Sequence, residues 1–511
     1  MKCAWSSSRS AHWPVTLALA LALAGAGACA PAGALAADAL AGQAPAPCRV
    51  PGIKTMVLCG SVTRPLDPAQ PSGSSIEVGY VVVPALARAK LPDPVFLFAG
   101  GPGQSAIKLS PAWSQQLARL NNRRDLVFID QRGTGRSAPL ECDDQRHRPL
   151  AQQLDLQLGS VWLAQCREKL ARLPYGDLRQ FTTLIAMQDA NAVRQALGAQ
   201  RINLIGASYG TRAVLEYMRQ FPQAVRRSVL DGVAPPDMVL PQSFSIDGQA
   251  AFDALLQACT AAPACAALHP ALAADWTTLL QSLPRSAVVA HPLTGQREEL
   301  GVTRELVLGW VRTALYAPAA AAALPHAIGS AAQGNLEPLI GLGLALAARR
   351  NTALAEGLHF SVVCSEDLAR MQGDAPAGQD FGDASAQFYR RACADWPRAE
   401  VPAAFYQLAL APAAALLLSG GLDPATPPRH AERVARALGP LAKPVRVPNA
   451  GHGVMGLGCM RDVVARFIEA EDDSAALALD ASCALAIPRP PVFVPVALRP
   501  AVPAASAGAR P

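Results

Sequence analysis

A serine between a predicted strand and a predicted helix offers the clearest chemistry in this sequence. Ser208 is the central residue of a Gly-Ala-Ser-Tyr-Gly pentapeptide at positions 206–210. Residues 201–205 are mostly apolar and predict a short buried strand, and residues 211–221 have the spacing of an amphipathic helix. A tight turn in this setting holds the serine in a strained conformation with its hydroxyl exposed, and the flanking glycines allow close packing. Because such a pentapeptide also arises by chance, its flanks and its downstream partners decide between the two interpretations.

A serine hydroxyl becomes a nucleophile when a base removes its proton, and the base needs a carboxylate to orient it. Six histidines follow the serine in the chain: His269, His291, His326, His359, His430 and His452. Of these, His452 lies in a glycine-flanked loop directly after a strand predicted at 445–447, where an imidazole can reach over the sheet edge. Asp423 follows another predicted strand, at 413–418, and precedes His452. We therefore expect His452 to be the base for Ser208 and Asp423 to orient it; an ordinary turn aspartate before proline is the alternative for Asp423.

The negative oxygen that forms when a serine attacks a carbonyl needs two backbone N–H donors. Tyr209, the residue after the serine, is expected to supply one of them. The other is expected from the glycine-rich loop 99–103, which follows a strand predicted at 95–98. Gly101 is the first candidate in this loop and Gly100 is the second; a glycine–proline turn with no further role is the alternative.

These side chains need a scaffold, and the sequence predicts a sheet of mostly parallel strands. Short apolar strands alternate with helical patterns, of which residues 186–197 are an example. The strands are predicted at 78–83, 95–98, 126–129, 201–205 and 227–231. Such alternation indicates a largely parallel sheet that helices cover on both faces. Since the order Ser, Asp, His is also that of the α/β-hydrolase fold, we predict this fold, with an inserted helical cap.

The cap is predicted between residues 236 and 405, where alanine and leucine dominate, helices follow one another and clear strands are missing. This segment is too long for a loop inside a compact domain. The predicted core therefore has two parts, residues 37–235 and 406–487, of which residues 37–75 form an irregular lead-in. A Pro- and Ala-rich tail follows at 488–511.

Residues 1–36 have the pattern of a signal peptide. A positive start, an apolar stretch at 15–25 and a small-x-small site predict cleavage before Ala37. Attachment of a lipid at Cys29 is the alternative. No later segment is apolar enough to span a membrane, so we expect an exported, periplasmic or secreted protein. The net charge of +6 is spread along the chain without a basic run, which gives no indication of nucleic-acid binding.

Ten cysteines lie beyond residue 36, an even number that favours disulfides in an exported protein. Sequential pairing is our choice among roughly 945 possible pairings. It predicts the bonds Cys48–Cys59, Cys142–Cys166, Cys259–Cys265, Cys364–Cys393 and Cys459–Cys483. Buried free thiols are the alternative. The cysteines form no Cys-x-x-Cys motif and have no accompanying histidine cluster, so we expect neither a metal nor another cofactor.

Four sequence elements together resemble one family of serine exopeptidases. They are Gly-Gly-Pro-Gly at 100–103, Asp-Gln-Arg-Gly-Thr-Gly-Arg-Ser at 130–137, the serine pentapeptide, and Gly-His-Gly at 451–453. From about residue 80 to 470 the chain is similar to the proline iminopeptidase and tripeptidyl aminopeptidase family, and the element at 130–137 is much more specific than the pentapeptide. Proline iminopeptidases typically carry His before Gly-Gly-Pro-Gly, where this chain has Ala99. That departure, and the segments that begin at Cys364 and Cys393, favour the secreted tripeptidyl branch.

The resemblance implies an enzyme that releases short N-terminal pieces from peptide substrates with a free N-terminus. Such an exopeptidase needs an anionic group for the substrate's ammonium and a cap that blocks longer chains. Glu366 and Asp367 are the candidates, since they lie near Cys364 at the expected return from cap to core; an acidic pair that caps a helix is the alternative. Asp130 and Arg132 are expected to brace the loops around the oxyanion glycines rather than to touch substrate.

Three functions stay open on the sequence. The first is an exported serine aminopeptidase that acts through an acyl-enzyme on Ser208. The second is an esterase or another acyl hydrolase with the same three residues, which the cap sequence does not exclude. The third is a non-catalytic binding module on the same fold, against which the intact set of Ser, Asp and His argues.

Overall fold

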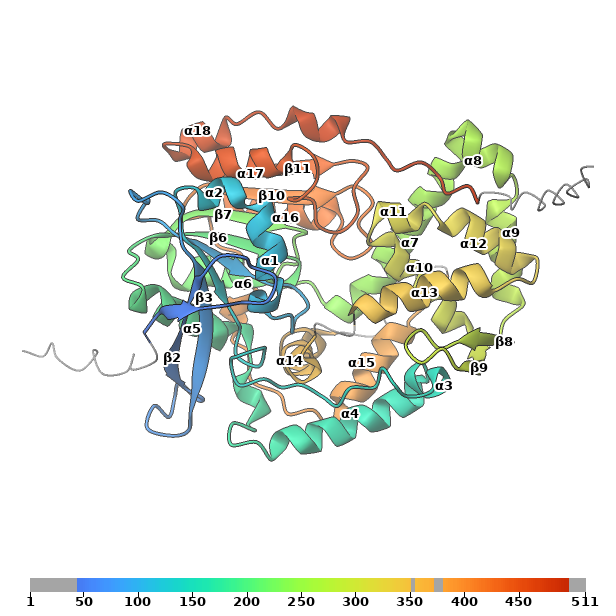
Figure 1. The fold of residues 1–511 in the computed structure, drawn as a ribbon, viewed down its shortest axis with the longest axis horizontal. Coiled ribbons are helices and arrows are strands. Elements are labelled where there is room, and N and C mark those ends of the chain that lie inside the picture. The colour runs from blue at the N-terminus through green and yellow to red at the C-terminus, as the bar shows by residue number, and fades with distance from the viewer. Residues whose placement is uncertain (1–43, 351–353, 372–379, 496–511) are drawn as a thin grey trace, which may run out of the picture. The chain divides into compact units, whose positions relative to one another are not determined.

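The computed structural model describes residues 44–350, 354–371 and 380–495, and within these ranges a nine-stranded sheet forms the core (Figure 1). Its strand order is β1-β2-β3-β5-β4-β6-β7-β10-β11. The strands are β1 (Ala46–Cys48), β2 (Val57–Pro65), β3 (Ser75–Val83), β4 (Val95–Phe98), β5 (Leu126–Ile129), β6 (Ile202–Ala207), β7 (Val225–Asp231), β10 (Ala415–Gly420) and β11 (Ala442–Val447). The pairs from β1 to β5 are antiparallel and those from β5 to β11 are parallel. The predicted fold class is confirmed by this sheet.

Two hydrophobic clusters pack on opposite faces of the sheet because successive strand residues point to opposite sides. Phe96 and Leu204 belong to one cluster with helices α5 (Thr183–Ala196), α6 (Tyr209–Gln220) and α16 (Pro428–Leu438). Their strand neighbours Leu97 and Ile205 belong to the other cluster, with helices α1 (Ala106–Gln116) and α17 (Met460–Glu469). Strands β4, β5 and β10 are buried along their whole length, which explains their continuous apolar sequences.

The parallel register brings the carboxyl ends of six strands to one edge of the sheet. Phe98 at the end of β4 pairs with Gly206 of β6, and Ala207 at the end of β6 pairs with Asp231 of β7. Asp231 in turn pairs with Leu418 of β10. The loops that carry the glycines, the serine, the aspartate and the histidine singled out in the sequence all follow these ends, so they meet at the same edge.

The cap helices have a hydrophobic cluster of their own, and Figure 1 shows them grouped beside the sheet. They are α7 (Leu240–Ala261), α8 (Pro263–Leu268), α9 (Leu272–Gln281), α10 (Arg304–Leu315), α11 (Pro318–Ala321), α12 (Leu324–Ala332) and α13 (Glu337–Arg350). Two later helices of the predicted cap segment, α14 (Glu356–Val362) and α15 (Ala384–Ala394), place Leu358 and Cys393 in the core cluster instead. Helices α3 (Leu150–Gln153) and α4 (Leu156–Ala171) precede α5.

Two expectations about strands were wrong. The segment 236–405 does contain strands, the antiparallel pair β8 (Arg285–Ala290) and β9 (Arg297–Val302). The lead-in 37–75 is likewise not irregular throughout, since it contributes β1 and β2 to the sheet. In β2, β8 and β9 only one or two residues are buried, so the apolar periodicity that reveals a strand was weak.

The ten cysteines of the described ranges form five disulfides, and these are the sequential pairs. Cys48–Cys59 links β1 to β2, and Cys459–Cys483 links the start of α17 to the chain after α18 (Asp473–Leu477). Within the same ranges, no helix is long and apolar enough to cross a bilayer. The predicted signal peptide at 1–36, with Cys29, and the tail from residue 496 onward lie outside the described residues.

Candidate active site

Ser208 occupies a strained turn between β6 and α6. Its φ is 56° and its ψ is −124°, a conformation that residues with a side chain rarely adopt. A Cβ on Gly206 would lie 2.3 Å from the carbonyl oxygen of Gly210, and a Cβ on Gly210 would lie 2.1 Å from that of Phe98. Both positions therefore require glycine, and the half-buried serine is held at the sheet edge as a nucleophile elbow requires.

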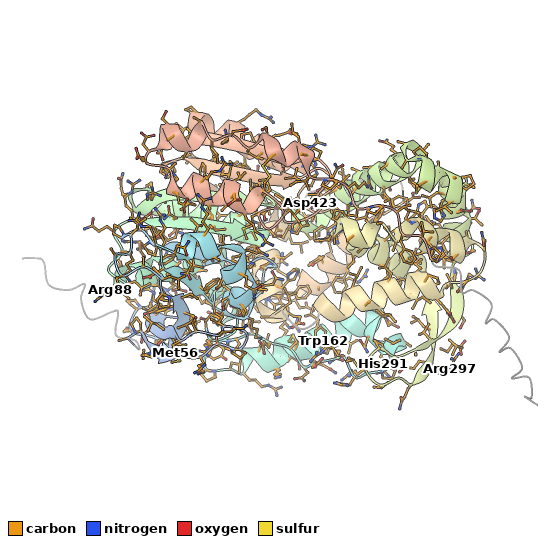
Figure 2. The ribbon with its side chains drawn as sticks, turned by 45° about the horizontal axis from the view of Figure 1, so that its top comes forward. Met56, Arg88, Trp162, His291, Arg297 and Asp423 are labelled. Atoms are coloured by element: carbon orange, nitrogen blue, oxygen red, sulfur yellow. A yellow bond between two sulfur atoms is a disulfide. The ribbon has the colours of Figure 1, made fainter. Side chains whose placement is uncertain are left out.

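Asp423 and His452 form a hydrogen-bonded pair at the same edge. Asp423 Oδ2 lies 2.8 Å from His452 Nδ1, and Asp423 Oδ1 accepts hydrogen bonds from the backbone N–H of Ala425 (2.8 Å) and Thr426 (2.9 Å). Burial alone would favour the neutral acid, but the charge and hydrogen bond of His452 outweigh it and lower the pKa of Asp423. Burial also opposes protonation of the imidazole, yet Asp423 raises the pKa of His452 to about 9. Asp423 lies on the side of the core that faces the cap helices (Figure 2).

A cap residue holds His452 from the other side. Tyr316, directly after α10, accepts the backbone N–H of His452 on its carbonyl oxygen at 2.8 Å. The Tyr316 and His452 rings meet edge to face, with centroids 5.0 Å apart. The position of the imidazole therefore depends on the core through Asp423 and on the cap through Tyr316.

Asp231, which the sequence analysis did not single out, connects the serine turn to the histidine loop. Its backbone carbonyl accepts the N–H of Ser208 at 2.8 Å, and its carboxylate accepts the N–H groups of Val454 (2.8 Å) and Met455 (3.0 Å). Asp231 ends β7, so a buried aspartate at a strand end was the available signal. Among the described residues Ser208 Oγ has no hydrogen bond; contacts between serine and histidine often tighten only when substrate binds.

The loop after β4 lies against the nucleophile. A Cβ on Gly100 would lie 3.2 Å from Ser208 Cβ, and Gly101, with φ of 115°, lines the adjacent cleft. Tyr209 is the first residue of α6, so its N–H has no acceptor within the helix. The Tyr209 side chain does not line the cleft. Its hydroxyl lies 2.6 Å from the Thr183 hydroxyl. Gly100 and the first residue of α6 therefore flank Ser208, and the oxyanion role of these backbone groups stays a prediction.

His359 supports the loop after β4, here called the oxyanion loop because the oxyanion donors are predicted in it. Its position in the sequence did not indicate this role. Its Nδ1 lies 3.1 Å from the carbonyl oxygen of Pro102, and its Nε2 lies 2.7 Å from the hydroxyl of Tyr389. The residue before α14 fixes the loop at a second point, because the N–H of Ala355 donates to the carbonyl of Gly103 at 2.8 Å. The loop geometry is therefore set by the chain that returns from the cap.

Asp130 and Arg132 lie in buried bracing contacts. Asp130 accepts hydrogen bonds from the Ser105 hydroxyl at 2.6 Å and from the N–H of Arg136 at 2.9 Å. Arg132 is paired with Asp189 at 2.6 Å. Both residues connect the loops behind the glycines and neither lines the cleft.

Glu366 and Asp367, the expected partners of a substrate ammonium, are buried elsewhere. Each is 1% exposed, and both pair with the buried Arg212 of α6, at 3.3 Å and 2.9 Å. Glu366 also accepts the N–H and hydroxyl of Thr183, and burial raises its pKa to about 7 although Arg212 opposes the shift. The assignment from sequence is corrected: these carboxylates do not line the cleft and are already paired with Arg212 in the core.

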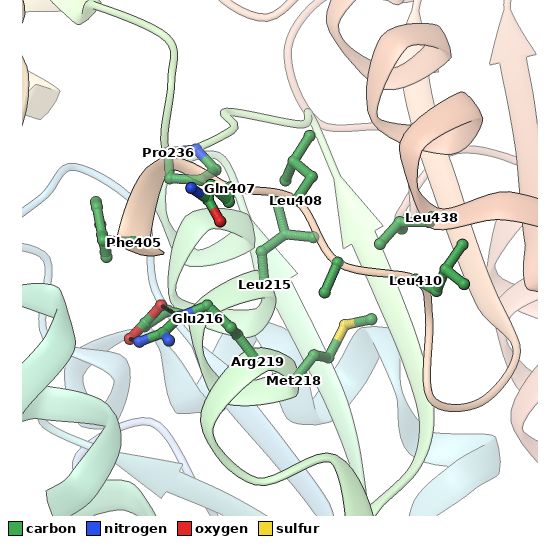
Figure 3. Close-up of a pocket in the computed structure, with 11 residues that line it drawn as sticks. Leu215, Glu216, Met218, Arg219, Pro236, Phe405, Gln407, Leu408, Leu410 and Leu438 are labelled. Atoms are coloured by element: carbon green, nitrogen blue, oxygen red, sulfur yellow. Dashed lines mark hydrogen bonds and ion pairs between the residues drawn. The ribbon is translucent and has the colours of Figure 1, made fainter. Parts of the chain in front are cut away.

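The cleft beside the oxyanion loop has a volume of about 1030 Å³. Gly101 and Tyr316 line it, together with the aromatic side chains of Phe244, Phe360 and Tyr389. A second hollow of about 20 Å³ lies between the distal half of α6 and residues 405–410 (Figure 3). It holds at most about one water molecule and lies at the opposite end of α6 from the serine, so the larger cleft is the candidate substrate site.

One carboxylate of this cleft has no ion pair within the described ranges. Glu356, the first residue of α14, lines the cleft and is half-buried. Burial raises its pKa, and the backbone N–H groups of Glu356 and Cys142 partly offset the shift. Its neighbour Ala355 is hydrogen-bonded to Gly103 in the loop after β4, and the Glu356 carboxylate itself accepts the backbone N–H of Cys142. Glu356 was missed because no motif surrounds it.

The parallel sheet, the strained serine at its edge and the buried Asp–His pair are those of the α/β-hydrolase fold, in which such a serine stands at the nucleophile position. A family model described as the α/β-hydrolase fold matches residues 93–290, and one described as TAP-like protein matches residues 379–476. Within this fold the chain is related to tripeptidyl aminopeptidases and to the serine protease Hip1, which confirms the resemblance predicted from the motifs.

The matched relatives are distant and are covered in part. The chain is 32% identical over 212 residues to the tripeptidyl aminopeptidase of Streptomyces lividans, which is 39% of each chain. It is 30% identical over 210 residues to serine protease Hip1 of Mycobacterium tuberculosis strain H37Rv, covering 37% of this chain and 39% of Hip1. A carboxylesterase B of M. tuberculosis strain CDC 1551 is 30% identical over 228 residues, or 40% and 42% of the two chains. The chain thus spans about two fifths of the length of the curated relatives it matches.

Proposed function

We propose that this protein is an exported serine aminopeptidase that releases short N-terminal peptides through an acyl-enzyme on Ser208. The observation that carries the proposal is the strained serine at a sheet edge shared with the Asp423–His452 pair, beside a cleft large enough for a peptide. Relationship to enzymes named tripeptidyl aminopeptidase supports peptides as the substrate class.

The reaction that we propose uses these groups in turn. His452 Nε2 takes the proton of Ser208, and Oγ attacks the peptide carbonyl carbon. The N–H of Tyr209 and that of Gly101 or Gly100 hold the oxyanion. His452 then gives the proton to the leaving amine, the C–N bond breaks, and a water deprotonated by His452 hydrolyses the ester. Asp423 keeps the Nδ1–H tautomer of His452 throughout.

Glu356 is the group that we assign to the substrate's free ammonium, in place of Glu366 and Asp367. It is an ionisable carboxylate in the cleft wall with no cationic partner in the described chain, and it stands beside the oxyanion loop. An ammonium bound there would lower the pKa of Glu356 and restore the ionised form that burial disfavours. Binding of the ammonium near the oxyanion loop limits cleavage to bonds close to the N-terminus.

Five disulfides support export to an oxidising compartment, the periplasm or the exterior, because such bonds rarely persist in the cytosol. The signal pattern at residues 1–36 is part of the same proposal.

The test compares peptidyl amides with free and acetylated N-termini, and short-chain esters, in wild type and in Ser208→Ala, Glu356→Gln and Glu141→Gln. We expect turnover of free peptides that is lost in Ser208→Ala. Glu356→Gln should raise KM for free peptides about 10–100-fold and remove the preference over acetylated ones. Glu141 lines the same cleft but pairs with Lys108, so Glu141→Gln is the matched control. Equal turnover of free and acetylated peptides by wild type would rule out the assignment of Glu356.

An esterase is the second candidate, and the relative named carboxylesterase B favours it. Turnover of esters without turnover of any amide would establish this alternative. If nothing is turned over and Ser208 resists acylating inhibitors, the protein is a binding module.

A further inference from the structure

Arg312 is a cation in the wall of the cleft, and most of its N–H donors have no acceptor among the described residues. It lies on α10 and lines the cleft, with its guanidinium carbon 3.8 Å from the ring centroid of Phe244. Its only hydrogen bond in the described part of the protein is from Nη2 to the Tyr316 hydroxyl, at 3.2 Å. Within those same ranges no carboxylate lies within ion-pair distance, and Nε is buried without an acceptor.

Other buried arginines of this protein are paired with carboxylates. Arg124 pairs with Asp93 at 2.9 Å, and Arg132 pairs with Asp189 at 2.6 Å. A guanidinium has five N–H donors, and stacking on an aromatic face occupies none of them. Phe244 therefore fixes the plane of the Arg312 guanidinium while leaving donors at its edge for a ligand, which reduces the entropy lost on binding.

The position of Arg312 relative to the catalytic base indicates which part of a substrate it meets. The Tyr316 ring centroid lies 5.0 Å from that of His452 and 5.7 Å from the guanidinium carbon of Arg312. These two distances put the guanidinium within about 11 Å of the imidazole, which is roughly three residues of extended peptide. Because His452 protonates the leaving amine, a leaving segment that runs past the imidazole toward α10 comes within that reach of Arg312.

We propose that Arg312 binds a carboxylate of the leaving group, no more than about three residues beyond the scissile bond. The C-terminal carboxylate of a short peptide and an acidic side chain share this chemistry, and the bidentate fork of a guanidinium suits both. Together with Glu356 on the acyl side, Arg312 gives the cleft one charged group for each end of a short peptide. The inference rests on the proposed peptidase function and adds the class of substrate to it.

The test uses one peptide sequence in several forms with the same scissile bond: a free C-terminal acid, the C-terminal amide, and amides with Asp or Asn in the leaving segment. Wild type should prefer an acid over its neutral counterpart about 10–100-fold in kcat/KM. Arg312→Met, which keeps the apolar stem against Phe244, should bring that ratio close to one. Arg312→Lys should restore part of it, and Arg304→Met, on the same helix but paired with Asp380, should leave it unchanged.

The ratio of kcat/KM for acidic and neutral peptides distinguishes a role of Arg312 in substrate binding from a purely structural role. If Arg312 only positioned Tyr316 and His452, its replacement would lower turnover of acids and neutral forms equally, and that result would overturn the proposal. Equal turnover of all peptide forms by wild type would also overturn the proposal for Arg312 while leaving the peptidase proposal intact. This comparison does not depend on the folding of any variant. A preference for the free C-terminus alone, or for the Asp peptide alone, identifies which carboxylate is bound. Hydrolysis of esters without any peptide would instead refute the proposed function.

Discussion

Replacement of Asp423 by Asn tests the catalytic assignment most sharply, because the structure dictates how the new side chain must lie. Oδ1 of Asp423 accepts the backbone N–H groups of Ala425 (2.8 Å) and Thr426 (2.9 Å), so the amide oxygen of an asparagine would take that site. Its NH2 group would then face Nδ1 of His452, 2.8 Å from the present Oδ2. An NH2 donor forces Nδ1 to accept and puts the imidazole proton on Nε2. In that tautomer His452 cannot take the proton of Ser208.

Two effects of different size follow. The wrong tautomer lowers kcat by about 10⁴ in the serine protease triad, which corresponds to about 5 kcal/mol of barrier. Asp423 is also the reason that the pKa of His452 stands near 9. With that pKa only about one imidazole in a hundred is neutral at pH 7, so kcat/KM of wild type should rise roughly 50-fold from pH 7 to pH 9. Loss of the carboxylate charge lowers the pKa of His452. The rise of kcat/KM in Asp423→Asn should therefore move to lower pH.

The measurement is kcat/KM between pH 6 and 10 for a peptide with a free N-terminus, in wild type and Asp423→Asn. Asp237→Asn is the matched control, since Asp237 pairs with Arg433 and has no contact with His452. Thermal unfolding of all three proteins excludes a loss of fold. Retention of a tenth or more of the wild-type kcat by Asp423→Asn, or an unshifted pH profile, would refute the role given to this carboxylate.

Four further outcomes are expected. His359→Ala should lower kcat about tenfold with little change in KM, because the oxyanion loop loses its support; a change confined to KM would contradict this. Asp367→Asn should destabilise the fold by about 3–5 kcal/mol by unpairing a buried arginine, whereas Glu366→Gln should cost little in denaturant unfolding; equal losses would contradict the pairing. Since the pKa of Glu366 is raised from 4.5 to about 7, its contribution to stability is present below pH 4.5 and falls as the pH rises through 7, and Glu366→Gln should remove that decline. Removal of the Cys459–Cys483 bond, which joins residues 24 apart, should cost about 3.5 kcal/mol and lower Tm, and an unchanged Tm would show that the bond does not form.

The elements that carry the reacting groups could be predicted from sequence for a physical reason. Central parallel strands are buried on both faces, so β4 (Val95–Phe98) and β5 (Leu126–Ile129) are continuous apolar runs whose ends were predicted correctly. The reacting residues follow such strands in a fixed order, and glycines mark their turns. The outer strand β2 gave no such signal, because only two of its nine residues are fully buried.

Residues that recognise substrate had no comparable pattern. Glu366 looked suitable as an acid near a cysteine, but it is neutralised by Arg212, which lies 154 residues earlier in the chain. Glu356 looked ordinary, and only the folded chain shows that it lines the cleft without an ion-pair partner among the described residues. Which buried acid is paired and which is free depends on contacts between distant segments, and no local spacing records them.

The cap is best regarded as part of the catalytic machinery rather than as a lid. Tyr316 of the cap accepts the backbone N–H of His452 and packs on its ring, and Arg312 lies one helical turn before Tyr316 on α10. A shift of α10 that adapted the cleft to another leaving group would therefore also move the base. Since a misplacement of about 1 Å can cost two orders of magnitude in rate, cap and base must change together. On the proposed mechanism we therefore expect the substrate range to depend on the position of α10 as well as on the volume of the cleft.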